Sequence, residues 1–121
     1  VDRTKDAIRR RGENISSMEV ENEVNAHDEV VECAVVPIAS TDTEQEVLAV
    51  IVLQPEEQID PESLIRFLEP RLPYFMIPRY IRFVDVLPKT PTGKIQKYVV
   101  RELGLTEDTW DREAAGVKLK R

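Results

Sequence analysis

The sequence predicts a small α+β domain, with a mostly antiparallel sheet and two to three helices, preceded by a short N-terminal hairpin. Two runs rich in β-branched residues lie close together at residues 30–38 and 47–53, with a polar turn between them. Helix-capping and helical-periodicity signals stand on both sides of this pair. A chain of 121 residues is long enough for one hydrophobic core and too short for two.

The first helix is predicted over residues 17–26, directly after the hairpin. Ser16 can cap it, and Glu19, three residues later, completes the pattern of a capping box. Val20 and Val24 follow at helical spacing and mark one apolar face. The hairpin before this helix turns near Gly12.

The central strands and the second helix follow in order. Residues 30–38 and 47–53 should pair as antiparallel neighbours, because only a short link separates them. Asp60 followed by Pro61 predicts the start of a helix, since proline fits its first turn. Pro70 then ends this helix near residue 69.

The last third of the chain contains one more strand and one more helix. Residues 79–86 alternate as a third strand, and residues 95–103 repeat apolar side chains as a helix that stops at Gly104. In the remaining segment, residues 105–121, the apolar residues do not recur at the regular spacing of a helix or a strand. Trp110 is expected to anchor it on the domain, with a loose end over its last four residues.

Charge and composition exclude several function classes. The net charge is −6, with +3 over residues 1–12, −12 over residues 13–87 and +3 over residues 88–121. The acidic balance disfavours nucleic acid as a partner, whereas two basic ends can converge on a small anionic ligand or remain solvated. No run approaches the roughly 18 apolar residues of a membrane span. One Cys and one His predict no metal centre built on these residues.

Two segments have the composition of binding loops. Residues 88–94 hold two prolines, a glycine and finally Lys94, which can reach carboxylate or phosphate oxygens or remain a solvated loop lysine. This loop lacks the first glycine and the final hydroxyl residue of a nucleotide-binding P-loop. The second segment places arginines beside Gly12, which suits anion recognition or a simple hairpin turn. Cys33 is interpreted as a core thiol.

Three separated motifs stand in order along the chain. They are Asp2-Arg3-Thr4-Lys5-Asp6 with the glycine turn after it, Tyr74-Phe75-Met76-Ile77-Pro78-Arg79, and Pro88-Lys89-Thr90-Pro91-Thr92-Gly93-Lys94-Ile95 followed by Lys97. Together they resemble the C-terminal domain of adenylate-forming enzymes, which include acyl-CoA synthetases, peptide-synthetase adenylation domains and firefly-type luciferases. The resemblance runs from residue 1 to about Gly104, and the run from Gly12 to Ser17 looks closest to ligases of the carnitine/crotonobetaine type.

The resemblance implies a reaction in two halves, with a domain that swings between them. A carboxylate attacks the α-phosphate of ATP to give an acyl-adenylate and pyrophosphate, and the thiol of CoA then displaces AMP. Lys94 would be the catalytic and nucleotide-binding lysine of adenylation. Lys5 would lie at the hinge, about residues 3–6, and Arg3 would bind near the adenylate ribose.

The same resemblance assigns the glycine turn to the second half-reaction. Arg9, Gly12 and Glu13 align with the loop that faces CoA. Residues 1–104 would then form the mobile C-terminal domain and residues 105–121 a tail. The domain would be inactive without the large N-terminal AMP-binding domain that holds most of the ATP and acyl pockets.

The complete enzyme would use a small carboxylate, ATP with Mg, and CoA, with no cofactor held tightly by this domain. Cytoplasm is the predicted location, because the sequence shows no targeting segment. Two alternatives remain open. One is an adenylation domain that passes its acyl group to a carrier protein, and the other is a free-standing binding module of the same fold.

Overall fold

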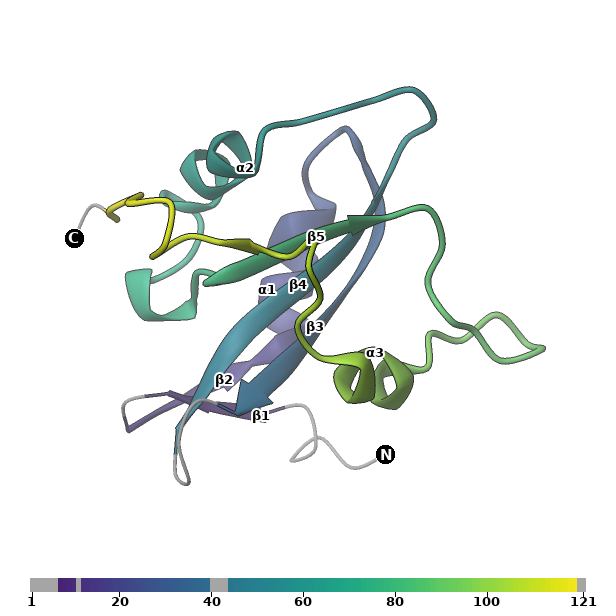
Figure 1. Ribbon diagram of the computed structural model, residues 1–121, viewed down its shortest axis with the longest axis horizontal. Coiled ribbons are helices and arrows are strands. Elements are labelled where there is room, and N and C mark those ends of the chain that lie inside the picture. Colours follow the sequence, from purple (N-terminus) through teal and green to yellow (C-terminus); the bar gives the residue numbers. More distant parts are fainter. Residues whose placement is uncertain (1–6, 11, 40–43, 120–121) are drawn as a thin grey trace.

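A computed structural model describes residues 7–10, 12–39 and 44–119. A two-stranded hairpin precedes a four-stranded sheet, and the main helices lie on the two faces of that sheet (Figure 1). The predicted α+β class, with its N-terminal hairpin, is confirmed. In chain order the elements are β1 (Ala7–Arg10), β2 (Glu13–Ser16), α1 (Ser17–Asn25), β3 (Val30–Ala39), β4 (Gln45–Leu53), α2 (Pro61–Leu68), the 3-10 helix η2 (Tyr74–Met76), β5 (Tyr80–Val84), α3 (Lys97–Leu103) and β6 (Trp110–Asp111).

The sheet is mixed, in the order β3-β4-β5-β6. β3 and β4 pair antiparallel as predicted, with Cys33 opposite Ile51. β4 and β5 pair parallel, because α2 and η2 carry the chain back across the sheet before β5 begins. The two-residue strand β6 then pairs antiparallel with β5. It has no counterpart in the sequence prediction, since two residues are too few for an alternating pattern.

Helix α1 begins as its capping signal predicts. The Ser16 side chain accepts a hydrogen bond from the Glu19 backbone N–H at 3.3 Å, which satisfies one of the free donors of the first turn. Val20 and Val24 are fully buried on its inner face. The α1 helix ends at Asn25, one residue before the predicted boundary.

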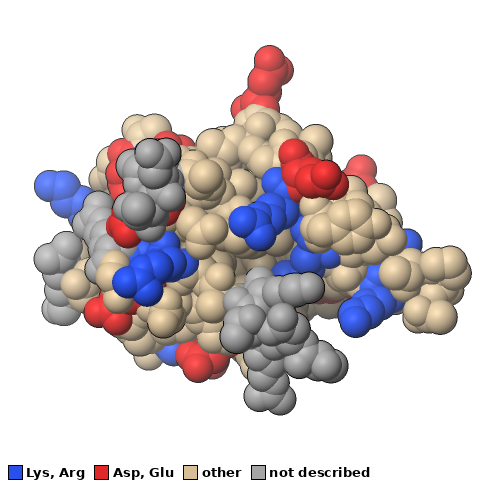
Figure 2. Space-filling model, turned by 90° about the horizontal axis from the view of Figure 1, so that it is seen from below, with Lys and Arg blue, Asp and Glu red and all other residues tan. Residues whose placement is uncertain are grey.

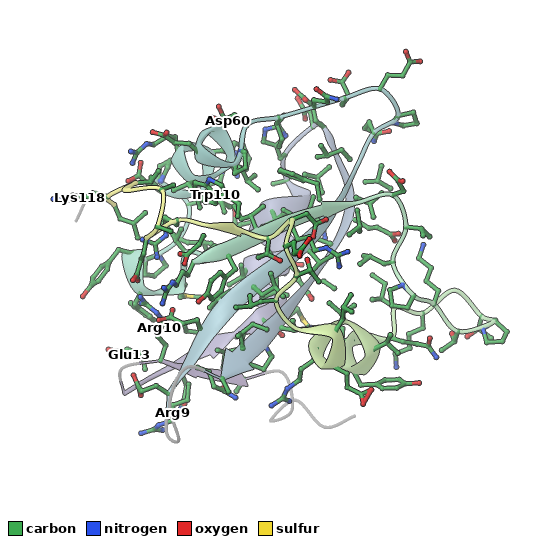
Figure 3. The ribbon with its side chains drawn as sticks, viewed as in Figure 1. Arg9, Arg10, Glu13, Asp60, Trp110 and Lys118 are labelled. Atoms are coloured by element: carbon green, nitrogen blue, oxygen red, sulfur yellow. The ribbon has the colours of Figure 1, made fainter. Side chains whose placement is uncertain are left out.

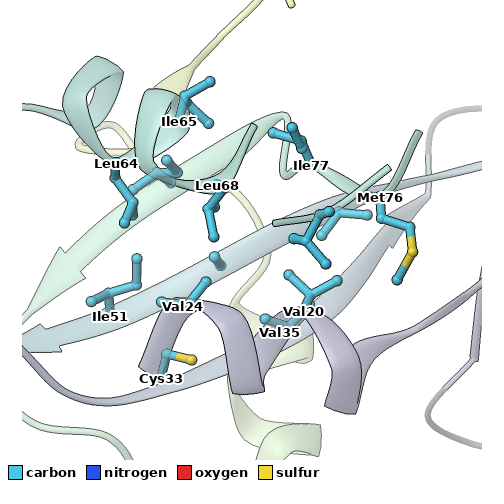
Figure 4. Close-up of a cluster of buried hydrophobic side chains, with 14 of the residues drawn as sticks. Val20, Val24, Cys33, Val35, Ile51, Leu64, Ile65, Leu68, Met76 and Ile77 are labelled. Atoms are coloured by element: carbon cyan, nitrogen blue, oxygen red, sulfur yellow. The ribbon is translucent and has the colours of Figure 1, made fainter. Parts of the chain in front are cut away.

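Two apolar clusters lie on opposite faces of the sheet. The larger one joins α1 and α2 through Val20, Val24, Leu64 and Leu68, which face Ile51 of β4 (Figure 4). The smaller one packs Val100 of α3 on the other face, against the side chains of Ala34, Val36, Leu48, Val50, Val52 and Leu87. Because β3 and β4 are covered on both faces, nearly all of their residues are apolar, without the alternation of a half-exposed strand.

Helix α3 is shorter than the sequence prediction. Ile95 forms an isolated antiparallel bridge with Lys89, so the two residues at 95 and 96 close the preceding loop and the helix starts at Lys97. Gly104 caps the helix with a φ of 63°, a left-handed conformation that glycine adopts without steric cost.

The C-terminal segment packs on the domain. Trp110 pairs with Ile81 at the sheet edge and packs against the larger apolar cluster, which confirms its predicted role as an anchor. The prediction of a loose end is wrong for its first two residues. Arg66 donates a hydrogen bond to the Lys118 carbonyl at 2.9 Å, and Leu119 packs against the same cluster.

Cys33 is a core residue, as predicted. Its side chain is buried beside α1 (Figure 4). Burial, reinforced by the nearby charge of Glu21, raises the pKa of the thiol to about 12. Since the thiolate is the nucleophilic form, Cys33 is unsuited to catalysis near neutral pH. None of the helices in the described segments is long and apolar enough to cross a membrane.

We expect Leu64→Ala to lower the free energy of unfolding by about 2–5 kcal/mol, because it leaves a cavity in the larger cluster. Leu103→Ala is the matched control: Leu64 is 0% exposed and Leu103 is 57% exposed. Urea denaturation of both variants measures the difference. Equal losses would contradict the placement of the core.

The thiol of Cys33 makes stability depend on pH. The folded state keeps the thiol proton up to about pH 12, whereas the unfolded chain loses it near pH 9. The free energy of unfolding should therefore fall between these values as pH rises, by up to about 1.4 kcal/mol per pH unit. Cys33→Ala lacks this contribution, so denaturation at a series of pH values should give it a shallower slope. Parallel curves would contradict the raised pKa.

Candidate functional site

The lysine loop, residues 88–96, has a closely bonded backbone. Thr90 N–H donates to the Lys94 carbonyl at 2.8 Å, and Gly93 N–H donates to the Thr90 carbonyl at 2.9 Å. At the base of the loop, Gln96 N–H donates a hydrogen bond to the Pro88 carbonyl at 2.8 Å. Gly93 supplies the turn with a φ of 88°, which disfavours any residue with a Cβ. The loop projects from the body beyond α3, on the right of Figure 1.

Lys94 lies on the exposed part of this loop. Hydrogen bonds fix its backbone, whereas its ammonium group extends into solvent. The Thr90 hydroxyl accepts a hydrogen bond from Lys94 N–H at 3.1 Å. Within the described segments, no carboxylate lies within ion-pair distance of the Lys94 Nζ. Lys89 differs, because its Nζ lies 2.8 Å from Glu32 Oε2. Only Lys94 of the two therefore presents an unpaired cation.

The glycine turn connects β1 and β2. Gly12 has a φ of 83°, and Arg9 and Glu13 on its two sides are exposed. Arg9 N–H donates to the Gln45 side chain at 3.0 Å, which holds the hairpin beside β4. Figure 3 shows the Arg9 side chain pointing away from the body. Among its described residues, the turn thus presents the cation of Arg9 and the anion of Glu13 to solvent.

The structure does not bring the two loops together. The glycine turn and the lysine loop lie at opposite ends of the domain in Figure 1. A single ligand cannot contact both loops in this arrangement unless it spans the domain. The predicted Arg3 and Lys5 lie outside the described residues.

The face seen in Figure 2 carries its Lys and Arg side chains in separate groups, with acidic and uncharged residues between them. The described residues of this face therefore form no continuous basic stripe of the kind that follows a nucleic-acid backbone. Among the residues that the structure describes, no three His, Cys, Asp or Glu side chains form a group that could hold a metal ion.

A buried charge network underlies the glycine turn, and sequence reasoning missed it. Arg10 faces inward, opposite to Arg9, and its Nε lies 2.7 Å from Glu46 Oε1. Arg79 Nη1 lies 3.7 Å from the other oxygen of Glu46, and Arg79 also donates two hydrogen bonds to Asp111, at 3.0 and 3.2 Å. The hydrogen bond with Asp111 is the main cause that raises the pKa of Arg79. The alternation of a strand predicts that Arg9 and Arg10 face opposite ways, which was the available signal.

Lys97, which follows the lysine loop, binds within the domain. Its Nζ lies 2.8 Å from Glu21 Oε2 and donates to Ser17 Oγ at 3.0 Å. Glu21 Oε2 also accepts from the Val35 N–H at 2.9 Å, at the edge of β3. Glu21 thereby joins α1, α3 and the sheet, and fixes the base of the lysine loop.

The sequence profile of the family named AMP-binding enzyme C-terminal domain matches residues 19–94. The chain is 37% identical over 110 residues to the peroxisomal trans-cinnamate:CoA ligase of Petunia hybrida, which covers 91% of this chain and 19% of that protein. It is 40% identical over 102 residues to a mitochondrial medium-chain acyl-CoA ligase of Rattus norvegicus, covering 84% of this chain and 17% of that protein.

The fold is similar to that of a solved Mycobacterium tuberculosis fatty acyl CoA synthetase, with a TM-score of 0.77 and 30% identity. The alignment covers 84% of this chain and 20% of that one. The chain thus spans about a fifth of the length of the relatives it matches. By its profile match and by these relatives, the chain belongs to the AMP-binding enzyme C-terminal domain family.

Proposed function

We propose that this chain is the mobile C-terminal domain of an ATP-dependent acyl-CoA ligase. The complete enzyme converts a carboxylate, ATP and CoA into acyl-CoA, AMP and pyrophosphate. The observation that carries the proposal is the unpaired ammonium of Lys94 on a backbone-bonded loop, at the opposite end of the domain from the glycine turn. The CoA-ligase relatives support the reaction class.

Lys94 serves the adenylation half-reaction. A carboxylate oxygen forms a bond to the α-phosphorus of ATP, and the bond from that phosphorus to the bridging oxygen breaks as pyrophosphate leaves. A cation whose backbone is already held in place can stabilise the negative charge that develops on these oxygens. The hydrogen bonds of Thr90 and Gly93 hold the backbone of Lys94 in advance, while its flexible side chain reaches the reacting groups.

The glycine turn serves the thioester half-reaction. The CoA thiol loses its proton and attacks the acyl carbon, and the acyl–phosphate bond breaks to release AMP. Of the residues that the structure describes, Arg9 and Glu13 are exposed charged groups near Gly12 that can contact the CoA chain. The wide separation of the two loops supports a domain that rotates between the half-reactions. Lys5 as the hinge and Arg3 near the adenylate ribose complete this proposal.

The proposed partner is a large N-terminal domain that holds most of the ATP and acyl pockets. The chain's coverage of only about a fifth of its relatives supports such a partner. Residues 1–104 would be the swinging unit and residues 105–121 the tail. Mg is proposed to enter the complete enzyme together with ATP.

Other features of the enzyme stay predictions. The cytoplasm is the predicted location, although one relative named above is peroxisomal and another mitochondrial. The resemblance to ligases of the carnitine type is also a prediction. A carrier protein in place of CoA, or a binding module without catalysis, is the alternative that the following experiments address.

Lys94→Ala in the complete enzyme should slow acyl-adenylate formation by about 100-fold or more, because it removes the cation from the developing charge. Thioester formation from supplied acyl-adenylate should remain. Pyrophosphate exchange and thioester assays measure the two steps separately. Lys89→Ala is the matched control, since Lys89 lies in the same loop and its ammonium is bound by Glu32 of β3. Equal loss in both half-reactions would contradict the role of Lys94.

Arg9→Ala should show the opposite pattern. We expect the KM for CoA to rise by about tenfold through loss of one charge-assisted contact, with pyrophosphate exchange unchanged. Arg101→Ala on α3 is the control, because Arg101 is exposed and outside both loops. If the thioester forms on a carrier protein and not on free CoA, the acceptor in this proposal is wrong.

A further inference from the structure

A pocket of about 480 Å³ lies where the C-terminal segment meets the β1–β2 hairpin and η2. It is a third place on the domain, apart from the lysine loop and the outward face of the glycine turn. Arg10 and Arg112 contribute guanidinium groups, and Tyr74, Val117 and Leu119 contribute apolar surface. A pocket of this volume, lined by apolar side chains and a few charged groups, is typical of small-molecule sites. Figure 3 shows Arg10 and Lys118 on the side of the domain where this pocket lies.

Arg112 is unusual among the buried cations of the domain. Its residue is only 6% exposed, and its Nε donates to the Pro78 carbonyl at 3.2 Å. Its backbone N–H donates to the Arg79 carbonyl at 2.8 Å, so both ends of the residue are fixed. Arg10 has Glu46 at 2.7 Å and Arg79 has Asp111 at 3.0 Å. Within the described part of the chain, no carboxylate lies within 4.0 Å of Arg112.

The free donors of Arg112 open into the pocket. No side-chain nitrogen or oxygen of the described residues is fully enclosed without a hydrogen-bond partner. The Nη1 and Nη2 groups, which have no protein acceptor in the described segments, therefore keep access from outside, and Arg112 is one of the residues that line the pocket. They form the end of the guanidinium fork that binds two oxygens at once.

The surroundings compensate the charge of Arg112 only in part. Burial, followed by repulsion from Arg10, lowers the pKa of Arg112, although Glu113 and Glu46 act in the other direction. A buried charge without a partner is costly, and an anion in the pocket would offset that cost. Arg112 can accept this anion without any rearrangement of its own contacts.

Shape and apolar lining favour a carboxylate over a phosphate. Among the described residues, the charged ones in the lining are Arg10, Arg112, Lys118 and Glu113, and Arg10 is already paired with Glu46. A planar carboxylate matches the two-nitrogen end of the fork, and the apolar wall suits a hydrocarbon body.

We propose that this pocket binds a small organic carboxylate, whose oxygens accept hydrogen bonds from Arg112 Nη1 and Nη2 while its apolar body lies against Val117 and Leu119. The site does not depend on the ligase activity proposed above. Its test uses the 121-residue chain alone, so failure of one proposal leaves the other standing.

The test is a titration of the chain with benzoate. The binding is monitored through the NMR signals of the Arg112 Nε–H and of the Gly116 and Val117 backbone amides. We expect saturating shifts with benzoate and about tenfold weaker binding in Arg112→Gln. Arg71→Gln is the matched control, because Arg71 is an exposed arginine that does not line this pocket. Inorganic phosphate at equal concentration tests the preference for a carboxylate.

Absence of saturating shifts at these signals would overturn the proposal. Equal binding of phosphate would overturn the carboxylate as the ligand, and equal binding by Arg112→Gln would overturn Arg112 as its partner. If Arg112→Gln does not fold, Arg112→Lys keeps the charge and loses the fork. Benzoate should then raise the unfolding temperature of the unmodified chain and raise that of Arg112→Lys less. Equal shifts would again overturn the site.

Discussion

The arrangement of the domain depends on the ion pairs of one buried carboxylate, that of Glu46. It lies on β4, 2.7 Å from Arg10 of the hairpin and 3.7 Å from Arg79 before β5. Arg79 in turn binds Asp111 of β6. A charge buried at this position must be neutralised, so the hairpin, the sheet and the C-terminal segment are held in one geometry around it. The glycine turn therefore projects from a fixed base.

The lysine loop depends on a second charged contact, at the β3 edge of the sheet. Glu21 binds Lys97 at 2.8 Å and the Val35 N–H at 2.9 Å, which fixes the start of α3 to β3. Three lysines in this part of the chain consequently have different environments. Lys89 pairs with Glu32, Lys97 pairs with Glu21, and Lys94 extends from a loop whose backbone is bonded to itself. A preorganised backbone with a free cation is suited to binding negative charge that develops during a reaction.

The domain thus separates rigid and adaptable parts. Apolar clusters on both faces of β3 and β4 supply the rigid body. The groups available to ligands stand on loops at its ends, where a ligand can approach without disturbing the core. Arg112 is the exception, because the C-terminal segment buries it and leaves only the end of its guanidinium accessible through a pocket.

The sequence by itself determined the elements and the two binding loops, because these rest on local rules. Ser16 with Glu19 began α1, Gly104 ended α3, and glycine and proline marked the loops. Tertiary structure decided the rest. The parallel pairing of β5 depends on a crossover, and the strand at Trp110 forms only because β5 offers an open edge. The pairing of Arg10 with Glu46 and the burial of Arg112 against the Pro78 carbonyl depend on partners more than 30 residues away, which no local pattern encodes.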